Sequence, residues 1–216
     1  MQQLETKNRI VILGSSKGLG YQTYLQLHQL YPDAEFLCIS RKIQKTELFD
    51  RTQILAADFS KSPIDPFIFE TIRNFHPTDI IYSAGGGPYG FFQDKKISDH
   101  EWAMNVNFMF PMALVKNLAD LQMRQMIFIG SSIAENQPDP KAASYCAAKH
   151  ALRGLMTTLQ VENTLPFKVR LFSPGYIATD LLPVHSPPRQ LGLARPAQQV
   201  AEDLISFFKS EQINWP

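Results

Sequence analysis

A tyrosine and a lysine stand four residues apart in the second half of this 216-residue chain, at Tyr145 and Lys149. Side chains at positions i and i+4 of a helix share one face, so the ammonium can lie near the phenol oxygen. A free phenol has a pKa of about 10, and a neighbouring cation lowers that pKa. Such a tyrosine can donate a proton to a forming alkoxide, or accept one from an alcohol, while a hydride moves.

A serine hydroxyl precedes this pair by thirteen residues, at Ser132. It ends a strand-like segment, and in parallel sheets ligands bind beyond the carboxyl ends of the strands. Its hydroxyl is therefore placed to hydrogen-bond a substrate oxygen. The spacing Y-x-x-x-K alone also arises by chance, and lysine is usually a solvated helix residue, so the pair needs support from the rest of the chain.

Three glycines near the N-terminus form the pattern G-x-x-x-G-x-G, at Gly14, Gly18 and Gly20. The pattern follows a β-branched run and precedes a segment with helical apolar spacing, which predicts a strand, a turn and a helix. A backbone without side chains lets a pyrophosphate come close, and the helix N-terminus supplies N–H donors. This context predicts a dinucleotide site.

The same turn allows a second interpretation. Residues 14–18 also match G-x-S-x-G, the nucleophile elbow of α/β-hydrolases, with Ser16 as nucleophile and a late histidine such as His185 as base. That alternative leaves Gly20 unexplained, and it gives no role to Tyr145 and Lys149.

Strand-like and helix-like segments alternate along the whole chain. The predicted strands are residues 9–13, 35–40, 53–57, 79–84, 126–130 and 168–172, and the predicted helices are 21–30, 66–75, 100–121, 143–163 and 197–209. Alternation at this spacing predicts βαβ units and a parallel sheet. Right-handed crossovers then favour a single-domain Rossmann fold over residues 1–216, doubly wound with helices on both faces. Pro111 either bends the helix over 100–121 or divides it, and the proline-rich residues 183–196 are interpreted as a loop.

Composition excludes several classes of protein. Apolar residues make up 44% and charged residues 19%, as in an ordinary globular domain. The net charge of +1 provides no basic field for nucleic acid. No apolar run approaches a membrane span, the polar N-terminus does not resemble a signal peptide, and Cys38 and Cys146 are expected to be reduced thiols. We therefore expect a cytoplasmic protein, and the histidine spacing predicts no metal site.

The motifs, taken in order, resemble the short-chain dehydrogenase/reductase superfamily over nearly the whole chain. Residues 13–20 resemble the family's T-G-x-x-x-G-x-G with Leu13 in place of threonine, and residues 82–85 resemble its N-N-A-G with both asparagines replaced. Residues 173–179 resemble the family's P-G segment beside the nicotinamide. In that family an asparagine holds a helix open around a water that relays protons to the lysine. The resemblance implies a catalytic tetrad of Asn107, Ser132, Tyr145 and Lys149.

The cofactor site follows from the same correspondence. The second predicted strand ends in Ser40, Arg41 and Lys42, with no acidic residue to bind a ribose 2′-hydroxyl, whereas Arg41 and Lys17 suit a 2′-phosphate. The alternative is that these cations are solvated loop charges. We predict NADP(H) rather than NAD(H), held by Gly14, Ser15, Ser16, Lys17, Gly18, Leu19, Gly20, Ser40, Arg41, Asp58, Phe59, Ser83, Ala84, Gly85, Tyr145, Lys149, Pro174, Gly175, Ile177 and Thr179.

The chain departs from the family in two places. Family members usually continue to a seventh strand, and residues 213–216 contain no clear strand. The segment that forms the substrate lid in the family is short here, at residues 180–185, which suggests an open site. Two apolar stripes on the long helices suggest a homodimer, although each is also typical of core; they are Phe108, Phe110, Leu114 and Leu118, and Leu152, Leu155 and Leu159.

The predicted function is hydride transfer between NADP(H) and a small carbonyl or alcohol, with Tyr145 as general acid or base. Extended relatives with epimerase or dehydratase activity share the tyrosine and lysine, but their glycine spacing is commonly G-x-x-G-x-x-G and their chains are longer. The alternative from another class is an NADP(H)-binding sensor or scaffold without turnover. Such proteins tend to lose the tyrosine or the lysine, and both are present here.

Overall fold

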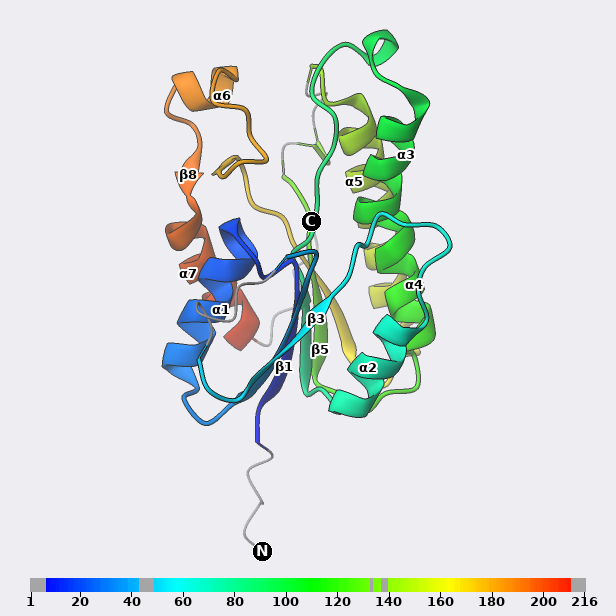
Figure 1. The fold of residues 1–216 in the computed structure, drawn as a ribbon, viewed down its shortest axis with the longest axis vertical. Helices are drawn as coiled ribbons and strands as arrows, with labels where there is room; N and C mark the ends of the chain where they lie inside the picture. Colours follow the sequence, from blue (N-terminus) through cyan, green and yellow to red (C-terminus); the bar gives the residue numbers. More distant parts are fainter. Residues whose placement is uncertain (1–6, 43–48, 133, 137–139, 211–216) are drawn as a thin grey trace, which may run out of the picture.

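A computed structural model describes residues 7–42, 49–132, 134–136 and 140–210. Its centre is one parallel sheet (Figure 1). The six strands of this sheet have the order β3-β2-β1-β4-β5-β6. The strands are β1 Arg9–Leu13, β2 Glu35–Ser40, β3 Thr52–Ala56, β4 Asp79–Tyr82, β5 Gln125–Ile129 and β6 Lys168–Phe172.

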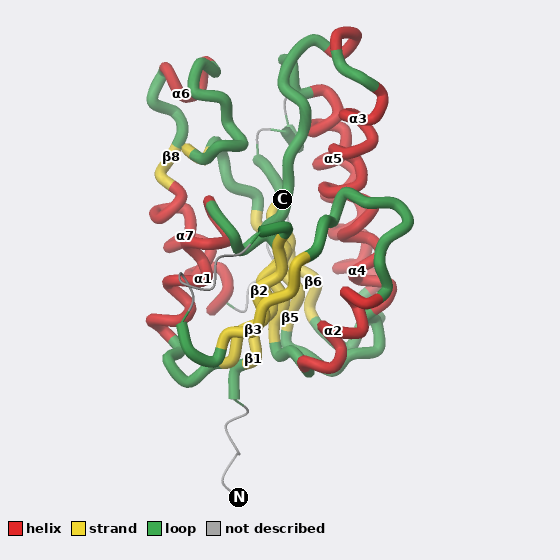
Figure 2. Tube along the Cα trace, in the orientation of Figure 1, coloured by secondary structure: helices red, strands yellow, loops and turns green. Residues whose placement is uncertain are grey.

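Helices cover both faces of the sheet. Figure 2 shows α1 and α7 on one side, and α2, α3, α4 and α5 on the other. Their bounds are α1 Gly18–Leu30, α2 Phe67–Phe75, α3 Ile97–Met104, α4 Phe110–Asn117, α5 Ala143–Glu162, α6 Pro187–Gln190 and α7 Ala197–Lys209; a 3₁₀ turn η2 covers Phe92–Asp94 and a π-helical turn η3 covers Asn105–Met109. None of the helices in the described part of the chain has the length and apolarity that crossing a membrane requires.

Burial on both faces explains why the strands are continuous apolar runs. In β1, Val11 and Leu13 belong to the core cluster under α2, α4 and α5, while Ile10 and Ile12 belong to the cluster under α1 and α7. Successive side chains of a strand point to opposite faces. A central strand in a doubly covered sheet therefore needs apolar residues at every position.

The direction in which the chain adds strands to the sheet reverses at β1: β2 and β3 lie on one side of it, and β4, β5 and β6 on the other. This strand pairs with β2 on one side and β4 on the other, so Leu13 is opposite both Ile39 and Tyr82. In open α/β sheets, ligands bind beyond the carboxyl ends of the strands at this switch point. The glycine turn after β1 and residues 83–87 after β4 lie there.

The long helix predicted over residues 100–121 is divided in the structure. Helix α3 ends at Met104, the turn η3 follows, and Pro111 is buried in the first turn of α4. The Phe110 amide donates to the Asn105 carbonyl five residues back. Proline has no N–H and clashes with the carbonyl four residues earlier, and the wider π turn accommodates it.

Residues 183–196, predicted to be a loop, contain two short elements. Helix α6 covers Pro187–Gln190, and β7 (Ile177–Ala178) pairs in parallel with β8 (Arg195–Pro196). The described main sheet has six strands. The sequence predicts no seventh strand at residues 213–216, and these residues lie outside the described ones. Four residues of the stripes proposed for a dimer are core residues, namely Phe110, Leu114, Leu118 and Leu152.

Candidate functional site

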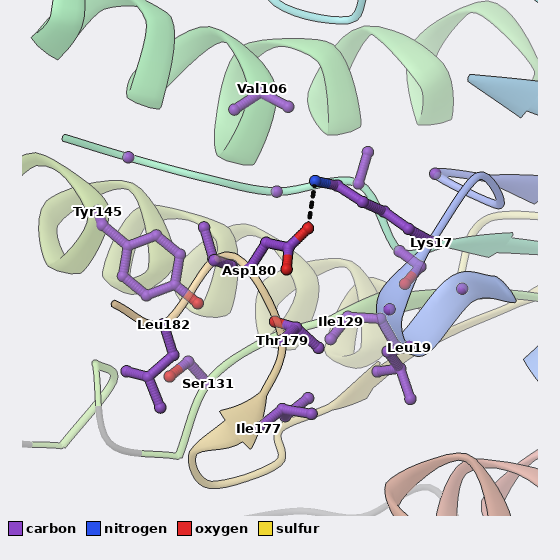
Figure 3. A pocket seen from close by; sticks show the side chains of 18 of the residues that line it. Lys17, Leu19, Val106, Ile129, Ser131, Tyr145, Ile177, Thr179, Asp180 and Leu182 are labelled. Atoms are coloured by element: carbon purple, nitrogen blue, oxygen red, sulfur yellow. Dashed lines mark hydrogen bonds and ion pairs between the residues drawn. The ribbon is translucent and has the colours of Figure 1, made fainter. Parts of the chain in front are cut away.

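A cavity of about 500 Å³ opens at the carboxyl edge of the sheet. Its walls are the glycine turn, the loop after β4, the N-terminal part of α5 and the segment after β6. Figure 3 shows Lys17 and Leu19 on one side of this cavity and Tyr145, Ser131 and Leu182 on the other. The cavity thus joins the predicted dinucleotide turn to the predicted proton-transfer pair.

The glycine turn has no room for side chains. Gly14 has a φ of 91°, and a Cβ added to it would lie 2.5 Å from the Ala84 nitrogen. A Cβ on Gly20 would collide with the Gly14 carbonyl oxygen, and Gly18, with a φ of 60°, begins α1. Backbone N–H groups at a helix start, beside a strand end and without Cβ atoms, form a cradle for a pyrophosphate. The residues present therefore fit a dinucleotide cofactor.

Two of the predicted serines, Ser40 and Ser15, connect the glycine turn to β2. The Ser16 amide donates to the Ser40 hydroxyl at 3.2 Å, which ties the turn to the end of β2. Ser15 is buried beside Cys38, and burial raises the pKa of that thiol to about 12, only partly opposed by a hydrogen bond with Ser15. Ser15 does not line the cavity.

Charged groups surround the turn. Arg41 is exposed and lines the cavity at the end of β2. Burial raises the pKa of Asp58, but hydrogen bonds from Ser60 and the nearby Arg41 charge outweigh it and hold that pKa below its usual value. Lys17 Nζ lies 2.8 Å from Asp180 Oδ2, an exposed ion pair that joins the turn to the segment after β7 (Figure 3).

The tyrosine and lysine begin α5, as predicted. Lys149 is buried, its Nζ donates to the Ile129 carbonyl at 2.6 Å, and it lies 5.6 Å from the centre of the Tyr145 ring. Burial lowers the pKa of Lys149 to about 8, although the charge of Glu135 partly opposes the shift. A Cβ on Gly87 would lie 2.9 Å from the Tyr145 Cβ, so the glycine run after β4 lets the tyrosine approach.

Asn107 lies behind this pair rather than in the cavity wall. It is buried in η3, where its Nδ2 donates to the carbonyls of Gly86 at 2.5 Å and Ala103 at 2.7 Å. A Cβ on Gly85 would be 3.0 Å from Asn107 Oδ1 and 3.8 Å from Lys149 Nζ. Tyr82 also contacts the π-helical turn η3, because its hydroxyl donates to the Val106 carbonyl at 2.6 Å. This tyrosine replaces the first asparagine of N-N-A-G.

The serine loop after β5 contains a carboxylate that the sequence analysis missed. Glu135 is buried, and its Oε1 accepts hydrogen bonds from the Ser131 amide at 2.7 Å and the Ser173 hydroxyl at 2.9 Å. Ser131 lines the cavity, whereas Ser132 is next to it, with its amide bonded to the Pro174 carbonyl at 2.9 Å. A glutamate three residues after a serine pair was the available signal.

Most predicted site residues come together around the cavity. Three do not line it, namely Ser15, Asn107 and Ser132. Those that do are Gly14, Ser16, Lys17, Gly18, Leu19, Gly20, Ser40, Arg41, Asp58, Phe59, Ser83, Ala84, Gly85, Tyr145, Lys149, Pro174, Gly175, Ile177 and Thr179. Lining residues outside the prediction include Trp102, Ser131, Tyr176, Asp180, Leu182 and Pro183.

Comparison with known proteins gives the family. Residues 8–189 match the short chain dehydrogenase family, and the chain belongs to it. Members are NAD(P)-dependent oxidoreductases, and this assignment replaces the hydrolase alternative built on Ser16.

Individual relatives are distant. The chain is 27% identical over 187 residues to 11-beta-hydroxysteroid dehydrogenase-like 2 of Arabidopsis thaliana, covering 80% of this chain and 60% of the relative. It is 26% identical over 225 residues to chlorophyll(ide) b reductase NOL of the same plant, covering 91% and 64%. The chain thus spans about six-tenths of the length of these relatives. A short chain dehydrogenase family protein of Francisella tularensis has a similar fold, with a TM-score of 0.80, 18% identity and coverage of 95% and 92%.

Proposed function

We propose that the protein transfers a hydride between NADP(H) and a carbonyl or alcohol, with Tyr145 as the general acid or base. The observation that carries this proposal is the placement of Tyr145 and the buried Lys149 in the same cavity as the glycine cradle. A nucleotide whose pyrophosphate lies on the turn at Gly14–Gly20 would extend along the cavity toward Tyr145.

Each group of the chain has a separate task in the proposed reaction. When bound, the cofactor supplies the hydride that adds to the carbonyl carbon. The Tyr145 hydroxyl donates its proton to the carbonyl oxygen, so that an alcohol leaves and the tyrosine is reprotonated from solvent. The Lys149 ammonium favours the transient phenolate. The hydroxyls of Ser131 and Ser132 are the nearby candidates to hold the oxygen.

The choice of NADP(H) rests on Arg41 and Lys17. Both line the cavity, Arg41 directly after β2 and Lys17 in the glycine turn, and the carboxylate Asp58 is engaged by Ser60. The exposed pair between Lys17 and Asp180 is weak, so Lys17 can exchange that partner for a phosphate. A kcat/KM with NADH comparable to that with NADPH would contradict this choice.

The first test is oxidation of NADPH, followed by its absorbance, with a panel of carbonyl compounds. We expect turnover in the wild type and, in Tyr145→Phe, a kcat lower by about 10²- to 10⁴-fold, because proton transfer is lost. The dissociation constant of NADPH should change little, since phenylalanine keeps the ring. Unchanged kcat in this variant would contradict the role of Tyr145.

The same experiment separates the alternative function. Tight NADPH binding without turnover on any carbonyl would favour a sensor or scaffold that keeps the fold and the nucleotide site. Absence of both binding and turnover would remove the cofactor proposal itself.

We also propose that the protein is a cytoplasmic homodimer formed through the outer surfaces of α4 and α5. The predicted stripes are largely core, but Met112 in α4, Val161 in α5 and Met109, just before α4, are exposed apolar residues. Light scattering at micromolar concentration should give twice the mass of the chain, and a monomer would contradict the dimer.

A further inference from the structure

The charged residues of the cavity wall already have tasks or partners. Among the described lining residues the charged ones are Lys17, Arg41, Asp58, Lys149 and Asp180. Arg41 and Asp58 lie at the ends of β2 and β3, where the nucleotide is proposed to bind, and Lys149 belongs to the tyrosine pair. Lys17 and Asp180 are paired with each other. When Lys17 turns to the nucleotide, Asp180 stays as an exposed anion, so no described lining cation is available to an anionic substrate.

The wall near Tyr145 is apolar instead. It consists of Pro88 and Tyr89 from the loop after β4, and of Leu181, Leu182 and Pro183 from the segment after β7. Figure 3 shows Leu182 on the Tyr145 side of the cavity. An uncharged apolar group gains free energy on leaving water for such a wall, whereas a charge would be buried without a partner.

Apolar surface continues outside the cavity on both sides. Phe91 and Phe92, which follow Tyr89 closely in the sequence, are 57% and 60% exposed, and Leu181 and Val184 are 50% and 70% exposed. Lys141 Nζ lies 5.1 Å from the centre of the Phe91 ring, and His100 stacks on Phe92. Large exposed apolar side chains next to lining residues in the sequence, rather than scattered singly, are consistent with a binding surface.

The segment after β7 is held in place and is not an open loop. The Arg189 guanidinium donates to the carbonyls of Thr179 at 2.7 Å and Leu182 at 3.3 Å. These hydrogen bonds engage the guanidinium with the backbone of its own segment. The Arg195 amide donates to the Tyr176 carbonyl at 2.9 Å, where β8 returns to β7. The backbone of the apolar wall is therefore anchored at several points.

We infer that the substrate is an uncharged, apolar carbonyl compound, or the matching alcohol, whose tail lies against the lining residues Tyr89, Leu181 and Leu182. This inference rests on the function proposed above. The reaction stays balanced as stated there: hydride and one proton reduce the C=O group to an alcohol, and NADPH becomes NADP⁺.

The test uses the full chain and n-alkyl methyl ketones of increasing length, each matched with a ketone of equal length that ends in a carboxylate. We expect kcat/KM to rise by about fourfold per methylene while the tail remains on the wall. The carboxylate series should be at least about tenfold poorer. A flat response to length, or a preference for the charged series, would overturn the inference and leave the reductase function standing.

A substitution pair locates the effect. Leu182→Asn should lower kcat/KM for the long ketones by about tenfold, with the shortest ketone little changed, because an apolar contact is replaced by an amide. Leu193→Asn is the control, since Leu193 belongs to the same segment and is 58% exposed but does not line the cavity. Equal effects of the two substitutions would overturn the placement of the tail.

A binding measurement distinguishes failure of the inference from failure of the proposed function. Primary amides imitate the carbonyl and are not reduced, and the same lengths are titrated onto protein saturated with NADPH. Affinity that rises with length supports the apolar site even where no ketone is turned over. Affinity that is independent of length overturns it.

Discussion

Lys149 combines a buried position with a charge that the proposed chemistry uses. Burial lowers its pKa to about 8 from the usual 10.5. At pH 7 the amine is charged in the folded and the unfolded state alike, so the folded state bears the desolvation of the charge. The shift corresponds to about 3 kcal/mol of lost stability. The fold tolerates this because the ammonium has one hydrogen bond, to the Ile129 carbonyl.

Lys149→Met should therefore stabilise the protein while removing activity. At pH 7 we expect the free energy of unfolding to rise on the order of 2 kcal/mol, because loss of the hydrogen bond offsets part of the gain. Between pH 8 and 10.5 the unfolded state binds more protons than the folded wild type, so wild-type stability rises with pH and the difference shrinks. Urea unfolding at pH 7 and pH 9.5 measures this, and an equal difference at both values would contradict the pKa.

At the scale of the element, η3 connects the site to the core. The Asn107 side chain bonds the Gly86 carbonyl across 21 residues of sequence, and Tyr82 bonds the Val106 carbonyl in the same turn. The turn is thus tied to the loop after β4 by its own Asn107 side chain and to β4 by the Tyr82 hydroxyl. Gly85, between Asn107 and Lys149, is positioned as a result.

Asn107→Leu tests this connection. Two buried carbonyls lose their donors, so we expect a loss of about 2–4 kcal/mol in the free energy of unfolding and a fall in kcat larger than the change in NADPH affinity. Asn117→Leu is the matched control: its Nδ2 also bonds a carbonyl four residues back, at 2.8 Å, but it is exposed. We expect its effect to stay within about 0.5 kcal/mol, and equal losses would contradict the role of burial.

The elements differ in how far the sequence predicts them. Strands at residues 9–13, 35–40 and 168–172 have the predicted bounds, because a doubly covered strand is a run of apolar residues that ends where burial ends. The turn η3 depends on bonds from Asn107 and Tyr82 to distant backbone, and α6 depends on Arg189 and its contacts with Thr179 and Leu182. Such contacts leave no periodic pattern, so local sequence does not reveal them.

The candidate site divides in the same way. Motif residues such as Gly14, Tyr145 and Lys149 were predictable because chemistry and backbone geometry restrict the residue type. Glu135 was not, because its relevance comes from the Ser173 hydroxyl, which approaches from another strand end.

At the scale of the molecule, the two edges of the sheet have separate tasks. The carboxyl edge carries the cavity, and a polar network lies toward the amino edge. There Arg170 is buried, bonding Gln125 Oε1 at 2.7 Å and Ser210 Oγ at 2.8 Å, with its guanidinium 3.9 Å from the Phe207 ring centre. Gln125 in turn bonds Asp79. The network joins the C-terminal end of α7 to β4, β5 and β6.

Arg170→Leu should therefore lower stability without affecting catalysis. Loss of charged hydrogen bonds in a buried network should lower the free energy of unfolding by about 3 kcal/mol, with the KM values for cofactor and carbonyl unchanged. Lys7→Met is the control at the same edge, since its ion pair with Glu35 is partly exposed and contributes at most about 1 kcal/mol. A change in KM caused by Arg170→Leu would show that the two edges are coupled.

The pairing of β7 with β8 has a consequence for how this scaffold can diversify. Residues 179–194 leave and rejoin the body of the protein at neighbouring points, Ala178 beside Pro196. The turn that is proposed to hold the nucleotide and the helix that carries Tyr145 belong to other parts of the chain. A foreign loop of different length that keeps Thr179 can thus be grafted between these two anchor points, and we expect it to change substrate selectivity without altering the proposed hydride transfer.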